Sequence, residues 1–149
     1  MNARRHTIAC LVTSLMFALS CADFEGAVDP THGFPDTVVA VPVFSRDIAP
    51  LFERRCAIGG CHTPQSAQAS LVLTPDVAYD NLVGVPSRLR PTEIRVVPGD
   101  APSSWLMAMI GDDQAARGGF SRMPLGSSPL TPNQIATIAN WINHGAERE

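Results

Sequence analysis

The sequence contains no lysine: in a chain of 149 residues, all eleven basic side chains other than histidine are arginines. Fourteen aspartates and glutamates outnumber these arginines, and the formal net charge is −3. An acidic chain without lysine has no lysine-rich docking face and no basic patch of the kind that binds the phosphates of nucleic acids. We therefore expect no nucleic-acid partner.

The sequence also lacks the residue patterns of several common catalytic sites. No Ser-His-Asp order, glycine-rich phosphate loop or pair of carboxylates stands out. Only 6% of the residues are aromatic, whereas thirteen are proline and eleven are glycine. This composition predicts one small domain of short elements joined by loops. We expect it not to be an enzyme.

The chain has no apolar run long enough to span a bilayer comfortably. Residues 8–19 are apolar and follow Arg4 and Arg5, which is the pattern of a signal peptide over residues 1–20. The sequence Ala18-Leu19-Ser20-Cys21 resembles a lipobox, in which Cys21 is lipidated and becomes the first residue. Cleavage by an ordinary signal peptidase and an uncleaved anchor are the alternatives. All three place the protein outside the cytoplasm, and we expect a periplasmic, membrane-anchored lipoprotein.

Residues 21–43 mix glycine and proline with acidic residues and show no helical period, so we expect a flexible linker to a domain of residues 44–149. His32, within this linker, is interpreted as a solvated loop residue. Loss of the signal peptide would remove Cys10, and Cys21 would carry the lipid. Two cysteines, Cys56 and Cys61, then remain for the domain itself.

Cys56 and Cys61 are followed at once by His62. Two cysteines and an adjacent histidine form the pattern by which a chain holds a haem through two thioether bonds and an axial imidazole. Four residues separate the cysteines here, where the usual spacing is two. Gly59 and Gly60 lie between them and permit the tight reversal that a flat ligand would require.

A second candidate ligand is Met123, which lies between a glycine pair and Pro124 in a predicted loop. A thioether on a loop can reach a metal from the side opposite His62, and a His/Met pair raises the reduction potential of haem iron. The alternative is a methionine that fills a gap in the core. Met107 and Met109 lie on a predicted helix, where core packing accounts for Met109 and exposure for Met107.

Apolar periodicity and capping signals predict four short helices. The first begins with Ser45 as N-cap and ends at Cys56, and the second follows Thr74 and ends near residue 83. A third covers about residues 102–110. The last begins at Thr131, which forms a capping box with Gln134, and ends at Gly145.

The order of these features resembles class I cytochrome c domains. A first helix leads into Cys-x4-Cys-His, and a Met-Pro loop precedes a helix reading Leu-Thr-Pro-x-x-Ile-x-x-Ile-x-x-Trp-Ile. The sequence ahead of the cysteines, from Asp47 to Phe52, and Val97-Pro98-Gly99-Asp100 also look like that family. The resemblance covers about two thirds of the chain, residues 44–146, and departs from the family in the cysteine spacing.

This resemblance implies an all-α, cytochrome c-like fold of four to five short helices around one covalent haem c. Cys56 and Cys61 would carry the thioether bonds, and His62 and Met123 would be the axial ligands. The implied function is one-electron transfer to and from redox partner proteins outside the cytoplasm.

The alternative is an exported binding module without haem, in which Cys56 and Cys61 form a disulfide. A zinc site is disfavoured because sequence neighbours such as Cys61 and His62 rarely bind one tetrahedral ion together. His144, at the predicted end of the last helix, is interpreted as exposed. A thioredoxin-like pair would need two residues between the cysteines.

The lipobox predicts that Cys21→Ser releases the protein from the membrane fraction, because the variant has no thiol to acylate. Fractionation and N-terminal sequencing measure this. Cys10→Ser, within the predicted signal peptide, is the matched control and should leave the protein in the membrane fraction. Membrane retention of the Cys21→Ser protein would contradict the lipobox interpretation.

Overall fold

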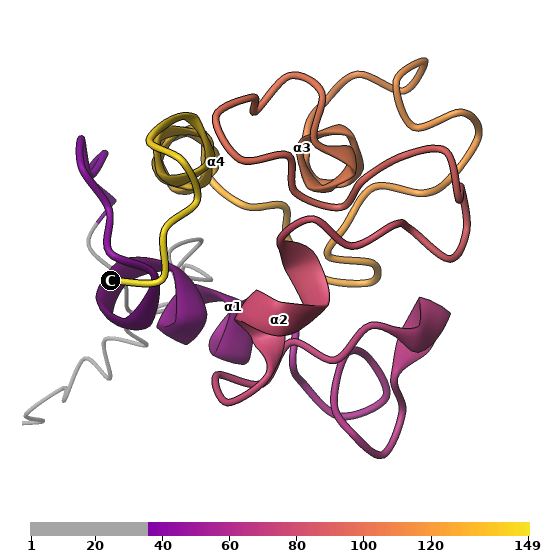
Figure 1. Ribbon diagram of the computed structural model, residues 1–149. Coiled ribbons are helices and arrows are strands. Elements are labelled where there is room, and N and C mark those ends of the chain that lie inside the picture. Colours follow the sequence, from indigo (N-terminus) through magenta and orange to yellow (C-terminus); the bar gives the residue numbers. More distant parts are fainter. Residues whose placement is uncertain (1–35) are drawn as a thin grey trace, which may run out of the picture.

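A computed structural model describes residues 36–149 of the protein. The predicted signal peptide, Cys21 and His32 lie outside the described residues. The described residues form short helices joined by long loops (Figure 1). In order, the elements are η1 (Phe44–Ile48), α1 (Ala49–Arg55), η2 (Gln68–Ser70), α2 (Ala78–Leu82), α3 (Trp105–Ile110) and α4 (Pro132–Asn143).

Helices are the main regular elements between residues 36 and 149. Paired extended backbone occurs there as isolated bridges, which join Val83 to Val96, Pro86 to Ile94 and Val97 to Asp100. The first two bridges run beside the segment that follows α2 and hold residues 94–96 against it. These bridges place Arg95 near α2. The start of α3 lies there too, because Trp105 N donates to the carbonyl of Ile94 at 2.9 Å.

The core forms where the two ends of the domain meet. The π-helical turn η1 packs against α4, and the ring of Phe44 lies 5.2 Å from that of Trp141. Ile48, Phe52 and Ile138 are fully buried in the same cluster. The C-terminus returns to η1 (Figure 1), where Ser45 Oγ donates to Glu149 Oε2 at 2.9 Å. The last helix therefore packs across the first helical segment.

The first helix begins earlier than predicted, and Ser45 is not its N-cap. Val43 holds that position, and its N–H donates to Asp47 Oδ2 at 2.8 Å. Phe44 is buried, so the turn must start there to bring its ring to the core. The Asp47 carboxylate thus accepts from the N–H of Val43, which has no partner within the helix.

The second and third helices begin later than predicted. Thr74 does not cap α2: its carbonyl accepts the N–H groups of Val77 and Ala78, which forms a turn before the helix. The helix α3 begins at Trp105, because the backbone of Ser104 just before it is extended. Its Oγ donates to Asp100 O at 2.8 Å and accepts from Val97 N at 2.9 Å.

The helix α4 has the predicted ends. Thr131 Oγ1 accepts from Gln134 N at 3.2 Å, and Gln134 Oε1 accepts from Thr131 N at 3.0 Å, so the capping box is confirmed. Gly145 follows the helix with a φ of +98°, a left-handed conformation that favours glycine.

The described part of the predicted linker, residues 36–43, is bound along α4. Asp36 O accepts from Asn133 Nδ2 at 2.9 Å, and Asp36 Oδ1 accepts from Thr131 Oγ1 at 2.8 Å. Val39 bonds Thr137 and Asn140 through its N–H and carbonyl. The polar face of α4 therefore binds this segment instead of facing solvent.

Thr131 joins the capping box to this bound segment, so Thr131→Ala should lower the free energy of unfolding by about 1–2 kcal/mol. Chemical denaturation monitored by circular dichroism measures the change. Thr92→Ala, at an exposed loop position, is the control and should change it by less than about 0.5 kcal/mol. Equal stability of the two variants would contradict the role given to Thr131.

Candidate functional site

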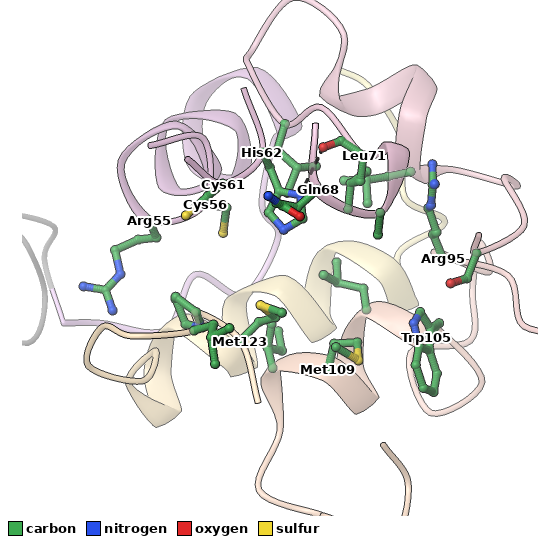
Figure 2. Close-up of a pocket in the computed structure, with 18 of the residues that line it drawn as sticks. Arg55, Cys56, Cys61, His62, Gln68, Leu71, Arg95, Trp105, Met109 and Met123 are labelled. Atoms are coloured by element: carbon green, nitrogen blue, oxygen red, sulfur yellow. Dashed lines mark hydrogen bonds between the residues drawn. The ribbon is translucent and has the colours of Figure 1, made fainter. Parts of the chain in front are cut away.

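A cavity of about 410 Å³ lies between the segment that follows α1 and the surface formed by α3 and the Met123 loop. This volume falls in the range of about 300–1,000 Å³ typical of ligand and cofactor sites. Most of the lining is apolar, and Figure 2 shows the polar and sulfur-containing residues around it. The aliphatic residues of the lining include Ile58, Leu71, Leu73, Leu82, Leu89, Leu106, Ile110 and Leu125.

The structure brings all four predicted haem-site residues of the domain to this cavity. Cys56, Cys61, His62 and Met123 all line it. In Figure 2, His62 and Met123 reach into it from opposite sides, and the two cysteines lie at one end, beside His62. Residues from distant parts of the sequence therefore line one cavity.

The segment between the cysteines folds back on itself. Cys61 N donates to the carbonyl of Ile58 at 3.0 Å, and His62 N donates to that of Cys56 at 3.1 Å. Gly60 allows the reversal with a φ of +82°, where a side chain would be strained. The four intervening residues thus form a compact turn that returns the chain to the cavity wall.

His62 is held in one orientation by the main chain. Its Nδ1 lies 3.0 Å from the carbonyl oxygen of Leu71, shown as a dashed line in Figure 2. A carbonyl can only accept, so in the neutral ring Nδ1 carries the proton and Nε2 has the lone pair. The hydrogen bond to Leu71 fixes the ring and leaves Nε2 available as a metal ligand.

Met123 lies on a loop, as predicted, and is tied to α3. Its N–H donates to the carbonyl of Met109 at 2.8 Å. Met109 also lines the cavity, although the sequence assigned it to core packing; Met107 is not among the lining residues. Trp105 and Met109 are one helical turn apart and both line the cavity, so the i, i+4 pair was the available signal.

The two cysteines are half-buried, free thiols in this structure. Burial raises the pKa of the Cys56 thiol to about 12, although the neighbouring charge of Arg55 acts in the opposite direction. Cys56 is therefore protonated at neutral pH, which is unlike the activated thiolate of a redox or catalytic cysteine.

Sequence reasoning missed two buried cations at the cavity. Arg55 is 2% exposed and Arg95 is 8% exposed, and both line it. No aspartate or glutamate stands among the described residues of the lining. Burial lowers the pKa of both guanidinium groups, but arginine keeps its charge. For Arg55, the sequence signal of burial was its position on the same face of the first helix as Ile48 and Phe52.

Other candidate ligands lie elsewhere. His144 is exposed at the end of α4, as predicted, with Nδ1 2.7 Å from the carbonyl of Asn140. Within residues 36–149, no three His, Cys, Asp or Glu side chains gather where one metal ion could bind. None of the helices in the same range has the length and apolarity needed to cross a membrane.

Comparison with known proteins gives no match: no family model fits the chain, and no curated protein or solved structure is significantly similar to it.

Proposed function

We propose that this protein is a class I c-type cytochrome that carries single electrons outside the cytoplasm. One haem c is bound covalently by Cys56 and Cys61, with His62 and Met123 as axial ligands. The observation that carries the proposal is the geometry of His62, whose free Nε2 belongs to a ring fixed at the wall opposite Met123.

The residues of the cavity fit this group. The aliphatic walls suit the flat apolar macrocycle, and two thiols stand at one end beside the imidazole. The cavity also contains buried positive charge from Arg55 and Arg95 without any acidic residue in its described lining. Buried cations favour an anionic partner, and haem carries two carboxylates.

Bound haem supplies the exchange of one electron between ferric and ferrous iron. His62 and Met123 would both bind the iron, and a soft thioether ligand such as Met123 would favour the ferrous state. The aliphatic side chains exclude water. No residue has to act as acid, base or nucleophile, and the proposed partners are redox proteins in the same compartment. Cys21 would attach the carrier to a membrane.

Replacing both cysteines tests this proposal against the alternative of a haem-free binding module. Cys56→Ala/Cys61→Ala, expressed with c-type maturation machinery, should carry little haem and fold poorly, because the ligand stabilises only the folded state. Haem content and cooperative thermal unfolding are the measurements. Cys10→Ala, in the predicted signal peptide, is the control. A haem-free double variant as stable as the wild type would refute the proposal.

Replacing the methionines tests the axial ligand. Met123→Ala should abolish the far-red sulfur-to-iron charge-transfer band and lower the reduction potential, because thioether ligation favours ferrous iron. Met107→Ala and Met109→Ala should keep the band. The second should also cost about 2–5 kcal/mol of stability, since Met109 is buried. Loss of the band in Met109→Ala, with retention in Met123→Ala, would assign the ligand to Met109 instead.

A further inference from the structure

Arg55 occupies an unusual position for a charged side chain. It is the last residue of α1, directly precedes Cys56, and lines the cavity. Figure 2 places it at the end of the cavity where the cysteines lie. With 2% of its surface exposed, its charge is shielded from bulk water. Its charge is therefore screened less than that of an exposed arginine.

The contacts of Arg55 link two parts of the site. Its Nη2 donates to the carbonyl of Ser128 at 2.5 Å and lies 3.2 Å from that of Pro129. These carbonyls belong to the loop that follows Met123. Arg55 thus joins the helix that precedes Cys56 to the loop that carries Met123.

The charge of Arg55 is not neutralised within the described structure. Among residues 36–149 it forms no ion pair with a carboxylate, and its Nε and Nη1 are buried without a hydrogen-bond partner. Carbonyl oxygens stabilise the guanidinium but carry no net charge. A full positive charge therefore remains beside the loop that follows Met123, near the end of the cavity where the cysteines lie.

We propose that Arg55 is a positioning residue that raises the reduction potential of this site. The inference rests on the proposed function, since it concerns the haem held by Cys56 and Cys61. Reduction takes one electron from a partner protein, which is oxidised, and converts ferric to ferrous iron without moving a proton or breaking a bond. A fixed positive charge nearby favours this loss of positive charge at the iron.

Redox titration of haem-loaded Arg55→Gln and Arg55→Lys proteins, with Arg117→Gln as a control, tests the inference. Arg55→Gln removes the charge but keeps an amide donor, whereas Arg55→Lys keeps the charge. A neighbouring charge shifts a titration by about one to three powers of ten. We expect Arg55→Gln to favour the oxidised state by about tenfold, which equals about 59 mV for a one-electron couple. Arg55→Lys should recover most of this shift.

Arg117→Gln is the matched control. Arg117 is also buried and donates to two carbonyls, at 2.7 Å to Gly111 and 3.3 Å to Phe120, but it does not line the cavity. Its replacement should leave the potential unchanged. The sulfur-to-iron band, recorded for every variant, shows whether Met123 keeps its place, so that an effect of charge is separated from loss of the ligand.

The outcomes show whether the inference about Arg55 fails alone or together with the proposed function. A haem-loaded Arg55→Gln protein with the band and the potential of the wild type would overturn the inference alone. An equal shift in Arg55→Lys and Arg55→Gln would also overturn it, because charge would then not be the cause. If Arg55→Gln does not fold, Arg55→Met gives the same comparison. Wild-type protein without covalent haem would overturn the proposed function and the inference together.

Discussion

The described structure is organised around an apolar cavity, which the helices and the loops between them must enclose. The segment after α1 forms one wall, and α3 with the Met123 loop forms the other. Aliphatic groups gain dispersion energy from whatever packs closely against them. A ligand that fills the cavity would join the two walls and complete the core. On our proposal, binding and folding are therefore coupled, as they are in many small domains that carry a prosthetic group.

Loops make up much of this domain, and buried arginines hold several of them in place. Arg55 bonds the carbonyls of residues 128 and 129, Arg95 those of residues 70 and 81, and Arg117 those of residues 111 and 120. A guanidinium presents several donors in a rigid plane, so one side chain can bind carbonyls from two turns of backbone. The absence of lysine thus coincides with a structural use of arginine. Because these cations bond carbonyls, two of them leave positive charge at the cavity.

The sequence predicted the parts of the fold that depend on near neighbours. The capping box of Thr131 and the stop at Gly145 are local signals, and both ends of α4 are confirmed. The loop setting of Met123 followed from its glycine pair and proline in the same way. What could not be predicted depends on contacts between distant residues. Asp36 and Val39 bind α4 across about a hundred residues of sequence, and the burial of Arg55 requires carbonyls from the loop after Met123.

The central claim is that Cys56 and Cys61 hold a haem whose iron is bound by His62 and Met123. The most direct test is the intact mass of the denatured wild-type protein, expressed with c-type maturation machinery, together with its absorption spectrum. Our account predicts a mass that exceeds the mature chain by one haem, which survives denaturation because thioether bonds are covalent. It also predicts a reduced c-type spectrum and, in the oxidised protein, a sulfur-to-iron band. A folded protein with the mass of the chain alone, and with Cys56 and Cys61 joined in a disulfide, would contradict the account.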